Sequence, residues 1–167
     1  MFENYPEERL HIASITSRLD LMERKFRSIL MERIIDAGRP IEARDLLQVS
    51  GFDIACVEAL CNRMAAKRVI VRNHDGMVEF VYPVSALPTH HQVKLADGRS
   101  FYAMCAVDAL GAAFTFGQDT TISSKCSACG VPVSIEVTSE KVIAFEPPYL
   151  KVLHADLKQA NNWAGSC

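Results

Sequence analysis

The sequence predicts an α+β protein in which a helical, winged helix-turn-helix-like part precedes a β-rich part with one short apolar helix. Apolar residues recur at helical spacing through the N-terminal quarter. Short β segments separated by turn formers fill the second half. A turn-rich stretch lies between these regions, so we expect two domains, residues 1–85 and residues 92–167.

The N-terminal part reads as a series of helices. An amphipathic pattern over residues 7–37 predicts one helix or two, ending at Gly38. A short helix is expected over residues 41–47. A longer one follows over residues 53–67, where Asp53 can serve as the N-cap.

A β-hairpin is expected after these helices, because turn formers at 73–76 join apolar strands at 69–72 and 77–82. Helix, turn, helix and hairpin together outline a winged helix-turn-helix. A DNA-recognition helix usually offers basic and amide side chains near its start. The helix predicted over residues 53–67 instead starts with acidic and apolar residues. We therefore expect a structural module, with no nucleic acid as a partner.

The β-rich part follows a linker over residues 83–91, whose His90 and His91 are expected to be solvated. The pattern predicts strands at 92–95, 100–103, 120–124, 131–137 and 142–145, a further short β segment at 149–154, and one apolar helix at about 104–114.

Composition narrows the functional classes. The formal net charge of −2 gives no general attraction to nucleic acid or to an anionic membrane. The longest apolar run, 103–116, is shorter than the roughly 18 residues that a membrane span needs and contains Asp108. The acidic start over residues 1–8 resembles neither a secretory signal nor a basic transit peptide. We expect a cytoplasmic protein that has no membrane partner.

Cysteines are informative in a reducing compartment, where clustered thiols more often bind metals or react than form disulfides. The six are Cys56, Cys61, Cys105, Cys126, Cys129 and Cys167. Cys56 and Cys61 fall within a helical pattern of apolar residues, and we expect both to be small buried side chains.

Cys105 and Asp108 form the first candidate site. If their segment is helical, residues three apart share a face, so the thiol and the carboxyl group would lie side by side. Small apolar neighbours would raise the pKa of the carboxyl group by desolvation and let it hold a proton near neutral pH. The alternative is a helix N-terminus with a buried cysteine and an aspartate that caps backbone N–H groups. Spacing alone leaves both interpretations open.

Cys126 and Cys129 form the second candidate site, in a Cys-x-x-Cys-Gly pattern. The pattern resembles half of a zinc knuckle, and it also fits a redox pair. A closed zinc site needs two more ligands, which Cys105, Cys167 or His154 would have to supply.

Several segments, in order and spacing, resemble the organomercurial (alkylmercury) lyases. Residues 101–110, Phe-Tyr-Ala-Met-Cys-Ala-Val-Asp-Ala-Leu, are similar to the family's catalytic segment. Ser-Ser-Lys-Cys at 123–126 and Gly-Val-Pro-Val-Ser at 130–134 resemble its next two segments, and residues 143–147 resemble another. The similarity covers residues 93–148 well and extends more loosely over the N-terminal part.

The resemblance implies protonolysis of a carbon–mercury bond, which yields a hydrocarbon and Hg(II) as the bound product, with no cofactor required. Cys105 and Cys167 would be the two mercury-binding thiols, and Asp108 would take part in proton transfer to carbon. Cys126 would have a structural role. The implied partners are organomercurial small molecules, with cellular thiols or a mercuric reductase accepting the metal.

Two features depart from the family pattern. Cys129 stands where the family carries another residue, and the family continues beyond the position of Cys167, so the chain is expected to be C-terminally short. Two alternatives therefore stay open. One is a non-catalytic protein that binds or carries Hg, Zn or Cu, with Cys126 and Cys129 on the metal. The other is a thiol-based, metal-responsive winged-helix regulator.

Overall fold

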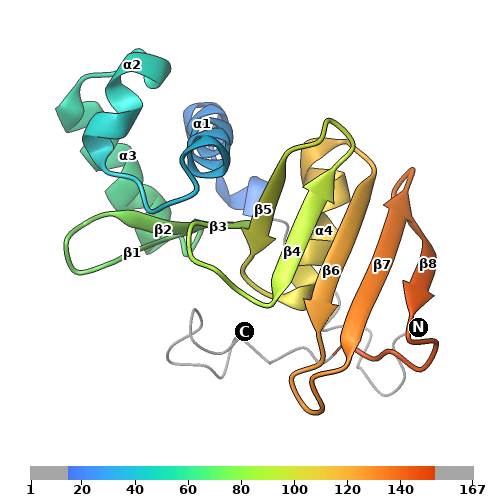
Figure 1. Ribbon diagram of the computed structural model, residues 1–167. Helices are drawn as coiled ribbons and strands as arrows, with labels where there is room; N and C mark the ends of the chain where they lie inside the picture. The colour runs from blue at the N-terminus through green and yellow to red at the C-terminus, as the bar shows by residue number, and fades with distance from the viewer. Residues whose placement is uncertain (1–14, 153–167) are drawn as a thin grey trace.

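The computed structural model describes residues 15–152 and contains one continuous eight-stranded sheet in the order β1-β2-β3-β5-β4-β6-β7-β8 (Figure 1). Every neighbouring pair of strands is antiparallel. The strands are β1 (Ile70–Arg72), β2 (Val78–Val81), β3 (Val84–Ser85), β4 (His91–Leu95), β5 (Ser100–Ala103), β6 (Thr120–Lys125), β7 (Pro132–Thr138) and β8 (Lys141–Glu146). The predicted α+β class is confirmed.

Helix α1 (Leu21–Ala37) starts where Asp20 and Glu23 form a capping box. The Asp20 carboxylate accepts the Glu23 backbone N–H at 2.8 Å, and the Glu23 carboxylate accepts the Asp20 N–H at 2.9 Å. A separate 3₁₀ turn, η2 (Ile15–Arg18), precedes it. The first part of the predicted helix lies outside the described residues. Gly38, at a φ of 60°, ends α1 as predicted.

The helix predicted over residues 41–47 is only partly right, because its first residue belongs to the sheet. Ile41 pairs with Val78 through N–H···O bonds of 3.2 and 2.8 Å, which commit its backbone groups to the strand ladder. Helical structure begins only afterwards, as the 3₁₀ turn η3 (Ala43–Leu46) and the single turn α2 (Leu47–Ser50).

Helix α3 (Ile54–Ala66) and the following hairpin agree with the sequence patterns. Asp53 is the N-cap, and its carboxylate accepts the Cys56 N–H at 2.8 Å. Strands β1 and β2 pair around the predicted turn. Helices α1 to α3 gather at the β1–β2 end of the sheet (Figure 1).

The stretch predicted as a linker instead joins the two parts of the sheet. Strand β3 lies inside it, and its residue Ser85 pairs with Phe80 of β2 on one side and Tyr102 of β5 on the other. His91 is the first residue of β4 and is half-buried, so its prediction as a solvated loop residue was wrong; His90 is exposed. The sequence pattern missed β3 because this strand is only two residues long.

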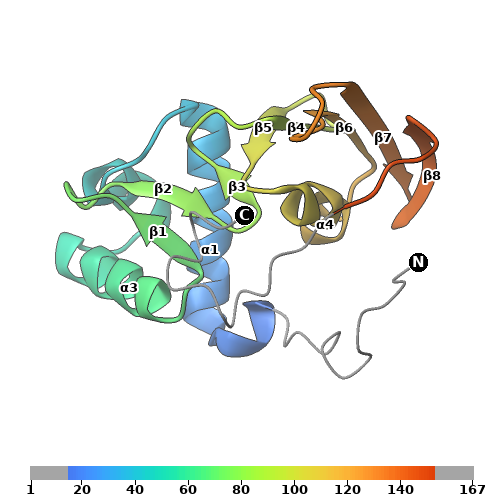
Figure 2. The same cartoon turned by 90° about the horizontal axis from the view of Figure 1, so that it is seen from below.

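Helix α4 (Ala106–Phe116) packs on strands β4 to β7 and covers one face of the sheet (Figure 2). Buried and exposed residues alternate along β4 to β7, which is the pattern of a sheet with one face packed and one face solvated. Strand β8 forms the edge and is exposed throughout. Residues 149–152 form no strand, because the chain turns at Pro147, whose carbonyl accepts the Leu150 N–H at 3.1 Å.

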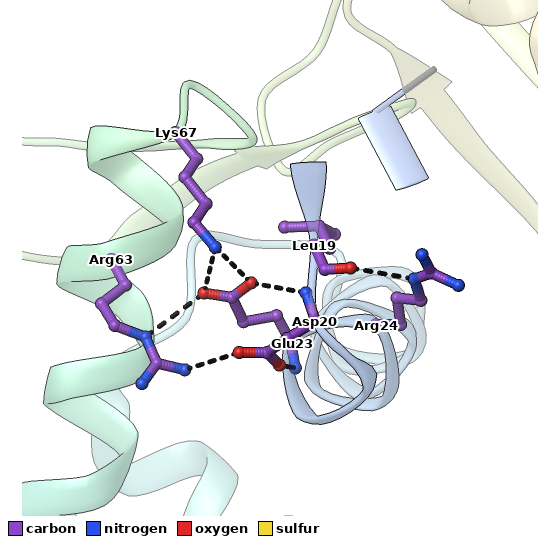
Figure 3. A network of polar contacts seen from close by, with 6 residues as sticks. All are labelled: Leu19, Asp20, Glu23, Arg24, Arg63 and Lys67. Carbon is purple, nitrogen blue, oxygen red and sulfur yellow. Dashed lines mark hydrogen bonds and ion pairs between the residues drawn. The ribbon is translucent and has the colours of Figure 1, made fainter. Parts of the chain in front are cut away.

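A buried carboxylate joins α1 to α3. The Glu23 side chain is fully buried, and its oxygens accept hydrogen bonds from Lys67 at 2.6 and 2.8 Å and from Arg63 at 3.2 Å (Figure 3). Asp20 adds a longer contact of 3.5 Å to Arg63. Burial alone would raise the pKa of Glu23, but the hydrogen bonds from Lys67 and from the Asp20 N–H outweigh it and lower the pKa.

Helix α1 is also tied to the sheet at two points. The Arg27 guanidinium donates to the Tyr82 carbonyl oxygen through Nε at 3.0 Å and Nη2 at 2.5 Å. Further along the helix, Glu32 pairs with Arg99, which also bonds Asp97 in the β4–β5 turn. One buried core runs through both parts, from Phe26 on α1 to Val137 on β7. Among the described residues, no helix has the length and apolar character needed to cross a membrane.

We predict that Glu23→Ala lowers the free energy of unfolding by about 2 kcal/mol, because it leaves Lys67 and Arg63 without their shared carboxylate and removes half of the capping box. Urea unfolding followed by circular dichroism measures this change. Asp36→Ala, at an exposed position of the same helix, is the control and should change stability by less than about 0.5 kcal/mol. Equal effects of the two substitutions would contradict the prediction.

Candidate functional site

Cys105 and Asp108 meet at the start of α4. Cys105 is the N-cap, in an extended conformation, and Asp108 lies in the first helical turn. The Cys105 thiol donates to Asp108 Oδ2 with a sulfur–oxygen distance of 3.3 Å. The side-by-side arrangement expected from their spacing is therefore present, with both side chains half-buried. The capping interpretation also has support, because the Asp108 carboxylate accepts the Cys105 backbone N–H.

Asp108 retains its proton to a higher pH than an ordinary aspartate. Desolvation raises its pKa from 3.8 to about 6, against the lowering effects of the Cys105 hydrogen bonds and the positive charge of Arg27. The buried residues of α4 that follow are small and apolar: Ala109, Ala112 and Ala113. A thiol beside a carboxyl group that holds a proton up to about pH 6 can bind a soft electrophile while the carboxyl group protonates the leaving group.

Arg27 is the site residue that the sequence did not reveal. It lies on α1, is half-buried, and is held by the Tyr82 carbonyl while its charge acts on Asp108. Desolvation lowers the pKa of Arg27, and the attraction of Asp108 opposes that change. An arginine on an amphipathic helix normally reads as a solvated residue, so no sequence signal distinguished it.

The topology brings the segment that carries Cys126 and Cys129 to the same end of the sheet as Cys105. Strands β5 and β6 both pair antiparallel with β4, so both end at the edge where β4 begins. At that edge His91 pairs with Ala103 of β5, and its Nδ1 lies 2.8 Å from Ser124 Oγ of β6. Cys105 follows Ala103 by two positions, and Cys126 follows Ser124 by two. The start of α4 and the β6–β7 turn accordingly lie at the same end of the sheet (Figure 1).

Cys126 and Cys129 lie in the tight β6–β7 turn. The Cys126 N–H donates to the Val131 carbonyl at 2.9 Å, and the Gly130 N–H returns to the Cys126 carbonyl at 2.8 Å. Gly130 has a φ of 73°, a left-handed conformation that favours glycine. The backbone N–H groups of Cys129 and Ala128, together with the Cys129 thiol, lower the pKa of Cys126. Cys126 is half-buried and Cys129 is exposed.

The described residues do not form a closed zinc site. No group of three or more His, Cys, Asp or Glu side chains among residues 15–152 is placed to hold a metal ion. Cys105 does not join Cys126 and Cys129 in such a group. Cys167 and His154, the other suggested ligands, lie outside the described residues.

The two cysteines of α3 fit the interpretation as packing residues. Cys61 is buried, and burial raises the pKa of its thiol to about 11. Cys56 is half-buried and packs against the core. Neither thiol belongs to the edge that carries Cys105.

Comparisons with known proteins point to one family. Residues 84–167 match the family model described as MerB, alkylmercury lyase. An alkylmercury lyase from Staphylococcus epidermidis is 27% identical over 126 residues, which cover 75% of this chain and 55% of that protein. One from Bacillus cereus is 24% identical over 149 residues, covering 83% and 65%. The chain thus spans between about half and two thirds of the length of these curated relatives.

A solved structure shares the fold. The mercury-bound form of MerB2 superposes with a TM-score of 0.63 at 24% sequence identity, covering 80% of this chain and 64% of that chain. At this identity the similarity concerns the fold alone.

We predict that ionisation of Asp108 makes the free energy of unfolding depend on pH. Because its pKa in the folded protein is raised, the folded state holds this proton longer than the unfolded state. The stabilisation that comes from protonation of Asp108 is therefore greatest below pH 3.8, and it is lost as the pH rises to about 6. Urea unfolding over this range should show wild type losing stability relative to Asp108→Asn as pH rises, because the asparagine amide mimics the protonated carboxyl group and does not ionise. Parallel profiles would contradict the prediction.

Proposed function

Because this chain belongs to the alkylmercury lyase family, we propose that it cleaves carbon–mercury bonds by protonolysis. The observation that carries the proposal is the 3.3 Å contact between the Cys105 thiol and the Asp108 carboxylate. Both residues fall within the segment that matches the family model. The contact joins a soft metal ligand to a proton donor, which are the two groups that protonolysis requires.

The proposed reaction uses the two groups in sequence. The Cys105 thiol gives its proton to the Asp108 carboxylate, and the resulting thiolate binds the mercury of the organomercurial, displacing the anion or small thiolate that mercury carried. The electron pair of the carbon–mercury bond then takes the proton from Asp108, so that a carbon–hydrogen bond forms as the carbon–mercury bond breaks. No oxidation or reduction occurs, and Hg(II) stays on sulfur. The raised pKa of Asp108, about 6, supports its role as the proton carrier.

A second thiol would weaken the carbon–mercury bond and retain the ion after cleavage. We propose Cys167 for this role, on the family resemblance; it lies outside the described residues. Organomercurial small molecules are the proposed substrates. Cellular thiols or a mercuric reductase are the proposed acceptors of Hg(II), and no cofactor is needed for the proposed chemistry.

For the N-terminal part, residues 1–85, we propose a winged-helix-like scaffold that does not bind DNA. Arg63 and Lys67, the basic residues of α3 and its C-cap, are both ion-paired to Glu23, which partly neutralises the charge that they would offer to phosphates. Residues 92–167 would be the catalytic part. A cytoplasmic location is proposed from the clustered cysteines, since those described are free thiols.

We predict that Cys105→Ser abolishes hydrocarbon release. The purified chain, with excess small thiol, would be incubated with phenylmercury or methylmercury salts, and benzene or methane measured by gas chromatography. Serine is a poor ligand for a soft ion, so the variant should fall to the uncatalysed background. Cys56→Ser, which removes a thiol that packs on the core away from this site, should retain activity. Tight mercury binding by the wild type without hydrocarbon release would overturn the lyase proposal in favour of metal binding.

Asp108→Ala should separate binding from cleavage. Loss of a positioned proton donor is expected to slow hydrocarbon release by about 10² to 10⁴-fold. Binding of phenylmercury, measured by loss of titratable thiol, should stay close to wild type because Cys105 is unchanged. Circular dichroism provides the control for folding. An unfolded variant would indicate that Asp108 serves chiefly to cap α4.

A further inference from the structure

The Cys-x-x-Cys turn between β6 and β7 is the thiol cluster that the proposed reaction does not use. Its two cysteines come from one short segment, whose conformation is fixed by the Cys126–Val131 and Gly130–Cys126 backbone hydrogen bonds. Cys126 is half-buried and Cys129 is exposed, and hydrogen bonding by the Cys129 and Ala128 N–H groups and by the Cys129 thiol lowers the pKa of Cys126. The pair is therefore a preformed dithiol rather than two isolated cysteines.

The number of ligands at this turn selects the kind of ion. Zinc in a structural site is nearly always tetrahedral, with four protein ligands. The described residues supply no third His, Cys, Asp or Glu at the turn. Hg(II) instead forms stable complexes with two thiolates alone and strongly prefers sulfur. N–H groups directed at sulfur stabilise the thiolate form that such binding needs.

We propose that Cys126 and Cys129 form a second Hg(II) site, separate from Cys105 and Asp108, that binds the inorganic ion through two thiolates. Binding is a ligand exchange without electron transfer. Two cysteine sulfurs replace two small thiolates on Hg(II), and the two cysteine protons pass to the departing thiolates.

The position of the dithiol gives the site a use. It lies at the end of the sheet where Cys105 also lies. There His91 of β4 pairs with Ala103 of β5 and forms a hydrogen bond with Ser124 of β6. Exposure of Cys129 leaves the site open to solvent and to external thiols. If the lyase proposal holds, on which this role alone depends, the dithiol accepts the Hg(II) product near its origin and passes it outward. Binding of inorganic Hg(II) itself does not depend on the lyase proposal.

Mercury retention tests the site without using catalysis. The full chain carrying Cys105→Ser would be incubated with mercuric chloride and excess glutathione, desalted, and assayed for mercury per chain by mass spectrometry. We expect it to retain about one equivalent, since two thiolates held in one turn outcompete glutathione. Adding Cys129→Ser should remove that equivalent. Cys129 is exposed, so this substitution leaves the core untouched.

The matched control adds Cys56→Ser to the same Cys105→Ser chain and should keep the equivalent. Unchanged retention after Cys129→Ser would overturn the proposal, as would Cys129-dependent retention of zinc in place of mercury. If the Cys105→Ser chain retains mercury in this assay while the wild-type chain releases no benzene from phenylmercury, the dithiol site stands and only the lyase proposal fails.

Discussion

The antiparallel pairing of β5 and β6 on either side of β4 is the constraint on which the rest of the arrangement depends. Two strands that share a partner must end at the same edge, so the chain leaves the sheet twice in one place. The first exit leads into α4 through Cys105, and the second leads into the turn that begins at Cys126. Two segments far apart in the sequence thereby leave the sheet at the same end.

A buried carboxylate fixes α1 against α3. Glu23 is an expensive group to bury, and it is tolerated because Lys67, Arg63 and a backbone N–H satisfy its oxygens. The charges of Lys67 and Arg63, which stay partly exposed, are thereby partly neutralised. From α1, Arg27 donates to the Tyr82 carbonyl, and its positive charge lowers the pKa of Asp108.

Local patterns predicted most of the fold and part of the site. Capping by Asp53, the end of α1 at Gly38 and the contact between Cys105 and Asp108 are short-range features, set by residues a few positions apart. The pairing of Ile41 with Val78 and the strand β3 depend on contacts between distant segments, which periodicity does not record. The role of Arg27 could not be predicted for the same reason, because the residues that it acts on, Tyr82 and Asp108, are distant in the sequence.

The contact between Arg27 and the sheet limits how the protein can be shortened or recombined by engineering. The segment that matches the family model begins at Val84, well after α1 has ended. A graft of that segment onto another scaffold would carry Cys105 and Asp108 but leave behind the cation that offsets the charge of Asp108. The unit to transplant is therefore the sheet together with α1, and sequence similarity alone would draw its boundary too late.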